Sequence, residues 1–107
     1  MEIIVHTIAL HPGADPAEFE AWVRDVDYAT CPELPSVQAF DVVRVPGERA
    51  GRYVEIIRVS SAAEFEKDMR TPAFQRLETA FSTMAAVTEE TCGTRLDPGY
   101  VSGRSGR

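Results

Sequence analysis

Residues 3–10 read Ile3-Ile4-Val5-His6-Thr7-Ile8-Ala9-Leu10, an apolar and largely β-branched run that predicts a strand from about Glu2 to Leu10. Alternation along an extended chain places His6 on the same face as Ile4 and Ile8. An imidazole there is either a hydrogen-bonded core residue or the acid/base of an enclosed pocket, because its pKa lies close to neutral. His6 is therefore the first candidate functional residue.

The rest of the chain predicts further helices and strands. Asp15-Pro16-Ala17-Glu18 and Ser61-Ala62-Ala63-Glu64 each pair an N-cap side chain with a glutamate three residues later, which is typical of a helix start. The first helix ends before Cys31-Pro32-Glu33-Leu34-Pro35, and Thr71-Pro72 restarts the second one. Strands are predicted over residues 36–45, 52–59 and 86–96.

This β-α-β-β-α-β order predicts a ferredoxin-like α+β fold, with a four-stranded antiparallel sheet and both helices on one face. We expect one domain over residues 1–97 and a flexible C-terminal tail over residues 98–107. The first helix should bury an apolar stripe at helical spacing, made of Phe19, Trp22, Val23 and Val26.

The predicted strands are apolar on both faces. In the first strand, Ile3 and Val5 oppose Ile4 and Ile8. In the second, alternation sets Val37, Ala39, Val43 and Val45 against Phe40 and Val42. Two helices can cover only one face of a sheet, so the other face needs a second cover. We therefore predict a homodimer formed through the sheet faces.

Composition argues against several classes of protein. A net charge of −6 and a pI near 4.8 indicate an acidic surface that would repel nucleic acid. No apolar run approaches the ~20 residues of a membrane span, and we expect a cytoplasmic protein without membrane contact. Cys31 and Cys92 are too few and too isolated for a disulfide scaffold or a zinc site. Because no phosphate-binding or dinucleotide motif is present either, we expect no metal and no other cofactor.

Five features spread over nearly the whole chain carry a family resemblance: His6; Trp22-Val23 with Asp25 and Asp27; Cys31-Pro32-Glu33-Leu34-Pro35-Ser36-Val37; Tyr53-Val54-Glu55-Ile56-Ile57; and Thr71-Pro72-Ala73-Phe74. Together they resemble the small REDY-like proteins of prodiginine-type pigment and bisindole pathways, within the dimeric α/β-barrel superfamily. The resemblance implies a coenzyme-free tailoring enzyme of secondary metabolism. Relatives in that superfamily include polyketide cyclases, small quinone-forming monooxygenases and haem-degrading enzymes. The cyclases often carry a histidine where this chain has Ala73, which argues against a polyketide cyclase.

His6 and Glu55 form the first candidate catalytic pair. The resemblance implies that His6 faces the helices, where pockets form between the sheet and the first helix. In the ferredoxin-like order the first and third strands are neighbours, so Glu55 could approach His6 and fix its tautomer. His6 would then act as a general acid/base. As the alternative, Glu55 is exposed or is paired with Arg44 or Arg58.

Three polar residues near the end of the first helix are further candidates. Asp25 and Asp27 oppose the helix dipole, a small cost that function could explain. A solvated acidic face is the ordinary alternative, more so for Asp27 than for Asp25. Tyr28 could donate a hydrogen bond to a substrate carbonyl, or could simply cover the helix end. We count Asp25 and Tyr28 as candidate catalytic residues beside His6 and Glu55.

Aromatic side chains could line a pocket for a flat heteroaromatic substrate, although the same residues also suit an ordinary core. Arg44 and Arg58 could hold a substrate carboxylate or ketone oxygen. Cys31 carries no local mark of an activated thiolate. The candidate substrate-binding residues are Trp22, Phe40, Arg44, Tyr53 and Phe74.

These observations favour a homodimeric, cofactor-independent enzyme that promotes cyclisation, condensation or dehydration of a pyrrole- or indole-type intermediate by proton transfer. One alternative is a cofactorless monooxygenase, in which the substrate's own carbanion reduces oxygen. Another is a non-catalytic binding protein that shields an unstable pathway intermediate. Oxygen consumption distinguishes the first alternative, and a His6→Ala variant distinguishes the second.

Overall fold

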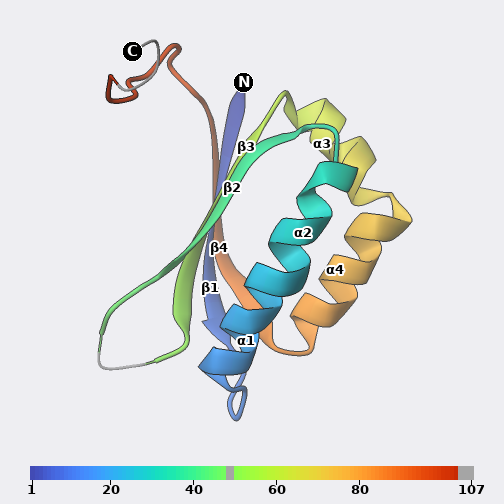
Figure 1. Ribbon diagram of the computed structural model, residues 1–107, viewed down its shortest axis with the longest axis vertical. Coiled ribbons are helices and arrows are strands. Elements are labelled where there is room, and N and C mark those ends of the chain that lie inside the picture. Colours follow the sequence, from blue (N-terminus) through green and yellow to red (C-terminus); the bar gives the residue numbers. More distant parts are fainter. Residues whose placement is uncertain (48–49, 104–107) are drawn as a thin grey trace.

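The chain folds into one sheet with helices against one of its faces (Figure 1). The computed structural model describes residues 1–47 and 50–103. The strands are β1 (Glu2–Leu10), β2 (Val37–Arg44), β3 (Arg52–Val59) and β4 (Ala85–Thr94). The helices are α1 (Pro16–Trp22), the π-helical turn η1 (Val23–Asp27), α2 (Tyr28–Thr30), the 3-10 turn η2 (Cys31–Glu33), α3 (Ala62–Met69) and α4 (Pro72–Ser82). This order confirms the predicted ferredoxin-like α+β fold.

The sheet is antiparallel, with the strand order β2-β3-β1-β4. β1 therefore lies inside the sheet: each of its residues has a partner in β4, and all but Leu10 also have one in β3. Ile4, for example, pairs with Ile57 of β3 and Cys92 of β4. A side chain in the middle of β1 thus meets groups from two other strands on the same face.

Two strands each carry an extra residue, which shifts the alternation of their side chains between the two faces of the sheet. Gln38 is left unpaired in β2, between Val37 and Ala39, and Thr88 is left unpaired in β4. The first bulge puts Val37 against the helix-side core together with Phe40. The prediction that Val37 lies on the opposite face from Phe40 was therefore wrong, because strict alternation does not hold across a bulge.

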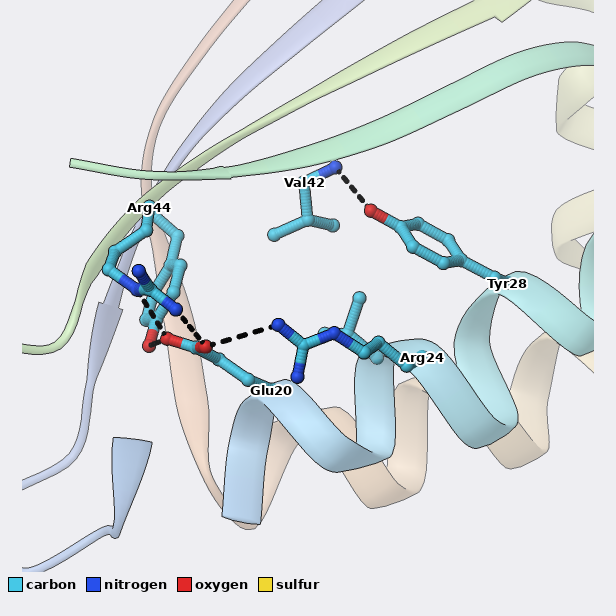
Figure 2. A pocket seen from close by; sticks show the side chains of 7 residues that line it. Glu20, Arg24, Tyr28, Val42 and Arg44 are labelled. Atoms are coloured by element: carbon cyan, nitrogen blue, oxygen red, sulfur yellow. Dashed lines mark hydrogen bonds and ion pairs between the residues drawn. The ribbon is translucent and has the colours of Figure 1, made fainter. Parts of the chain in front are cut away.

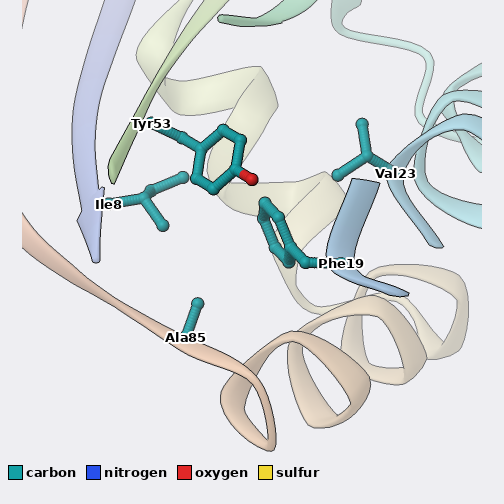
Figure 3. Close-up of a cluster of buried hydrophobic side chains, with 5 residues drawn as sticks. All are labelled: Ile8, Phe19, Val23, Tyr53 and Ala85. Atoms are coloured by element: carbon teal, nitrogen blue, oxygen red, sulfur yellow. The ribbon is translucent and has the colours of Figure 1, made fainter. Parts of the chain in front are cut away.

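One buried cluster of the core between the sheet and the helices consists of Ile8, Phe19, Val23, Tyr53 and Ala85 (Figure 3). The rings of Phe19 and Tyr53 lie 4.9 Å apart, and both residues are fully buried. Val26, predicted to belong to the buried stripe, is instead 42% exposed. It lies within the π-helical turn η1, whose wider winding changes which residues face inward.

The helix starts follow the predicted capping patterns. The side chains of Asp15 and Ser61 accept hydrogen bonds from the backbone N–H groups of Ala17 and Glu64. A further buried contact joins the helical layer to the sheet. Asp68 of α3 accepts hydrogen bonds from the backbone N–H and the hydroxyl of Ser36, just before β2.

The sheet face away from the helices, called the outer face here, carries apolar side chains together with polar ones such as Asp41 and Arg52. Its residues include Ile3, Val5, Ala39, Val43, Val54, Ile56 and Arg58. No helix in the described part of the chain could span a membrane. The predicted tail lies partly outside the described residues, which end at residue 103, and its flexibility stays a prediction.

Candidate functional site

The candidate site is centred on His6 in the middle of β1. Glu55 of β3 and Glu90 of β4 are its cross-strand partners on either side. His6 Nδ1 lies 2.6 Å from Glu55 Oε1, and His6 Nε2 lies 2.6 Å from Glu90 Oε2. The ring is thus held at both nitrogens by carboxylates, and the predicted approach of Glu55 to His6 is present in the structure.

The two carboxylates sit in different surroundings. The Glu55 side chain is 13% exposed, whereas that of Glu90 is 58% exposed. The sequence pattern alone does not mark Glu90 as a site residue. With regular alternation from Ala85, the side chain facing the helices would be that of Glu89, but the unpaired Thr88 gives this position to Glu90. Bulges commonly re-aim side chains beside functional sites.

These contacts favour the protonated imidazole. The hydrogen bond to Glu55 does most to raise the pKa of His6 above its usual value of 6.5, burial lowers it, and Glu90 raises it further. The net direction is upward. When His6 is neutral, Glu55 can accept from Nδ1–H, which leaves the Nε2 lone pair free to take a proton.

His6 opens into a cavity of about 500 Å³ between the sheet and the helices. This places it on the helix side of the sheet, as the family resemblance implied. Three of the predicted binding residues line the same cavity: Trp22, Phe40 and Phe74. The wall is mostly aliphatic and aromatic, a character typical of sites for small apolar ligands.

Asp27 brings a third carboxyl group to this cavity. It is 9% exposed, although the neighbouring positions Asp25 and Val26 are exposed. Burial, together with the negative charge of Glu55, raises the pKa of Asp27 to about 7. The prediction that Asp25 is the functional residue in preference to Asp27 differs from the structure, because the π-helical turn η1 directs Asp27 inward.

Cys31 also lines the cavity, and its thiol donates a hydrogen bond of 3.6 Å to the backbone carbonyl of Asp27. Burial, with the negative charge of Asp27, raises the pKa of the thiol to about 11. The thiolate is the reactive form of cysteine, so the Cys31 side chain is a weak nucleophile near neutral pH.

Three other predicted site residues, Tyr28, Arg44 and Tyr53, line a second, smaller pocket of about 250 Å³ between the first helical segment and the sheet (Figure 2). There Glu20 accepts hydrogen bonds from Arg44 and from the hydroxyl of Tyr53. Arg44, with Tyr53, lowers the pKa of Glu20 to about 2. The hydroxyl of Tyr28 accepts a hydrogen bond from the backbone N–H of Val42.

The structure therefore does not gather the sequence-predicted site residues in one place. Arg44, Tyr53 and Tyr28 line the smaller pocket and not the His6 cavity, while Asp25 is exposed on the helix. The alternative pairing of Glu55 with an arginine is absent, because Glu55 binds His6 and Arg44 binds Glu20. Over residues 1–47 and 50–103, no group of histidine, cysteine and acidic side chains is arranged to hold a metal ion.

Comparison with known proteins identifies the family of this chain. The family model described as "REDY-like protein HapK" matches residues 2–96. The chain belongs to the REDY-like HapK family. The resemblance predicted from the sequence is thereby confirmed. The crystal structure of HapK from Hahella chejuensis is similar to this REDY-like chain at 47% identity, covering 96% of this chain and 100% of that chain, with a TM-score of 0.86.

More distant structures share the fold of this REDY-like chain. SnoaB, a cofactor-independent oxygenase from Streptomyces nogalater, is 21% identical over 91% of this chain and 94% of that chain, with a TM-score of 0.75. A structure from Chloroflexus aurantiacus, assigned to the antibiotic biosynthesis monooxygenases, is 13% identical over 95% and 98% of the two chains, with a TM-score of 0.73. No curated protein matches the chain significantly.

Proposed function

We propose that this REDY-like protein is a cofactor-independent enzyme of natural-product biosynthesis that promotes cyclisation, condensation or dehydration of a pyrrole- or indole-type intermediate. The observation that carries the proposal is His6, held between two carboxylates and facing an apolar cavity of about 500 Å³. Membership of the REDY-like family, and the fold shared with proteins of antibiotic biosynthesis, favour a tailoring role in secondary metabolism.

His6 is the acid/base of this proposal, and Glu55 orients it. Glu55 is mostly buried and accepts from Nδ1–H, which leaves Nε2 as the atom that exchanges protons with the substrate. Glu90 occupies Nε2 in the free protein, but its side chain is 58% exposed and can leave without a large burial penalty. Substrate would replace Glu90 at this nitrogen.

The proton balance suits an elimination or a ring closure. When His6 is neutral, its Nε2 takes a proton from a carbon or nitrogen atom of the intermediate, and the resulting imidazolium returns a proton to a leaving hydroxyl group. The hydroxyl departs as water, and His6 ends in the protonation state in which it began. Positioned proton transfer of this kind typically contributes about 10²–10⁴-fold in rate.

The cavity wall matches a flat, conjugated substrate. Trp22, Phe40 and Phe74 line it with aromatic side chains on the helix side of the sheet. Aromatic stacking and burial would hold such a substrate beside His6 and keep bulk water away from it. Arg44 and Tyr53 have no part in this arrangement, because Glu20 already binds both.

Turnover of indole and pyrrole intermediates by wild type and by His6→Gln tests the proposal. We expect His6→Gln to lose about 10²–10⁴-fold in kcat while still binding the substrate. His11→Gln is the matched control, because His11 lies outside the cavity and contacts the backbone carbonyl of Ser82. Equal turnover by wild type and His6→Gln would remove His6 from the mechanism and favour a binding protein.

The shared fold with SnoaB favours one competing function, a cofactorless monooxygenase. The same base could remove a proton from an electron-rich substrate, whose carbanion would then reduce oxygen. An oxygen electrode distinguishes the two functions. Oxygen uptake in step with substrate loss would support the monooxygenase, while turnover under anaerobic conditions would support the proton-transfer enzyme.

We also propose that the protein is a homodimer formed through the outer face of the sheet. Val43 and Ile56 on this face are 46% and 38% exposed. Arg58 Nε on the same face is buried without a hydrogen-bond partner among the described residues. A second copy of the chain would cover these apolar side chains and bring polar groups within reach of Arg58.

A further inference from the structure

The side chain of Asp27 is mostly buried, and its carboxyl group faces the cavity. The residue is 9% exposed, yet in the described part of the chain its side chain has neither a hydrogen-bond partner nor an ion-pair partner. The thiol of Cys31 donates a hydrogen bond to its backbone carbonyl, not to its carboxyl group. Its oxygens are not among the fully enclosed polar atoms that lack a partner, so they are open to the cavity that Asp27 lines and to a ligand placed there.

The backbone directs this carboxyl group into the cavity. Asp27 closes the π-helical turn η1, in which Val26 faces outward and Asp27 lines the same cavity as His6 and Glu55. An apolar residue points to solvent here while an acidic one points inward, the reverse of the usual arrangement. Single π-helical turns occur frequently at functional sites.

Acidic side chains outnumber basic ones around the cavity. Its acidic lining residues are Asp27, Glu55, Glu66, Glu78 and Glu90. The lining has no arginine or lysine, and His6 is the one basic side chain in it. A ligand carboxylate would meet an unfavourable potential here, whereas an N–H group or a protonated nitrogen would be attracted. The arginines that sequence analysis proposed for a substrate carboxylate do not line this cavity: Arg44 binds Glu20, and Arg58 lies on the outer face.

We propose that Asp27 binds an N–H or protonated nitrogen of the heteroaromatic ligand, and that the cavity therefore selects neutral or cationic ligands over carboxylates. The heteroaromatic class of ligand rests on the proposed function; the selectivity for charge rests on the cavity itself. The ligand nitrogen supplies the partner that the Asp27 carboxyl group lacks in the free protein. Charge-assisted hydrogen bonds of this kind are among the stronger ones in proteins.

Three indole probes that differ in charge test this inference: tryptamine, tryptophol and indole-3-propionate, which are cationic, neutral and anionic near neutral pH. Binding is measured by calorimetry for wild type, Asp27→Asn and Asp25→Asn. The Asp25→Asn control removes the same charge from an exposed position of the same turn, outside the cavity. Circular dichroism is used to check that the variants fold.

We expect wild type to bind tryptamine at least about tenfold more tightly than indole-3-propionate, with tryptophol between them. Asp27→Asn should lose about tenfold in affinity for tryptamine, and Asp25→Asn should keep it. Undetectable tryptamine binding, equal affinity for tryptamine and indole-3-propionate, or an unchanged affinity in Asp27→Asn would overturn the inference. Unchanged turnover in His6→Gln would instead overturn the proposed function, whatever the charge selectivity.

Discussion

Glu90 lies 2.6 Å from His6 Nε2, on the side of the ring opposite Glu55. The two carboxylates bind the same imidazole but differ in how they are anchored, since Glu55 is mostly buried and Glu90 mostly exposed. This asymmetry suggests a division of roles. Glu55 sets the tautomer and position of the ring, and Glu90 holds the nitrogen that substrate would later use.

The asymmetry predicts how the pKa of His6 responds to substitution. Glu55→Gln should lower the pKa of His6 more than Glu90→Gln does, because the hydrogen bond to Glu55 is the largest cause of its rise. NMR titration of the imidazole ring protons measures the pKa change of His6 in both variants. The signals of His11 in the same spectra serve as an internal reference. Glu89→Gln is the control, since Glu89 neighbours Glu90 in β4 but does not line the cavity. Equal shifts in the two cavity variants would contradict the proposed roles.

The raised pKa of Asp27 predicts a pH-dependent cost to stability. Its pKa rises from 3.8 to about 7 on folding, so the unfolded chain ionises first as the pH increases. Stability is therefore lost between about pH 4 and pH 7, and the full cost is present above pH 7. Asp27→Asn should raise the free energy of unfolding by about 2–4 kcal/mol above pH 7 and by little near pH 4.

Urea denaturation at several pH values measures this effect, and Asp25→Asn is the matched control. A stabilisation of Asp27→Asn that stays constant with pH would mean that the burial of a charge is not its cause. If the variant is more stable and also binds tryptamine less tightly, the protein tolerates a destabilising carboxyl group for the sake of binding, a trade-off common at functional sites.

How far the site could be predicted depends on where the backbone is regular. The neighbourhood of His6 and Glu55 follows from two regular features, the alternation of side chains along strands and the adjacency of the first and third strands in the ferredoxin-like order. The inward-facing positions of Glu90 and Asp27 depend on irregular features of the backbone. An unpaired Thr88 and a π-helical turn each shift the inward-facing position by one residue, and neither carries a glycine or proline that would mark it in the sequence.

The fold's stability should depend strongly on the buried contact between Asp68 and Ser36. The Asp68 carboxylate is 5% exposed and accepts hydrogen bonds of 2.8 Å and 2.5 Å from the backbone N–H and hydroxyl of Ser36. Asp68→Ala leaves two buried donors unpaired and should lower the free energy of unfolding by about 2–3 kcal/mol. Glu66→Ala, an exposed position of the same helix, should change it by less than about 0.5 kcal/mol. Urea denaturation measures the free energy of unfolding of both variants. Similar losses in the two would show that the Asp68–Ser36 contact contributes no more to stability than an exposed side chain.

The proposed dimer makes a prediction about the outer face. Ile56→Asp introduces a charge at a central position of that face, where Ile56 pairs with Val5 in β1 and Asp41 in β2. If a second copy covers this face, the charge of the new aspartate would be buried in the interface beside Asp41, and the protein should become monomeric. Light scattering coupled to gel filtration at micromolar concentration measures the mass.

Val26→Asp is the control, because Val26 is comparably exposed but lies on the helical layer. A wild-type protein that is already monomeric would refute the dimer. A dimer that survives Ile56→Asp would place the interface elsewhere and leave the exposed apolar side chains of the outer face without an explanation.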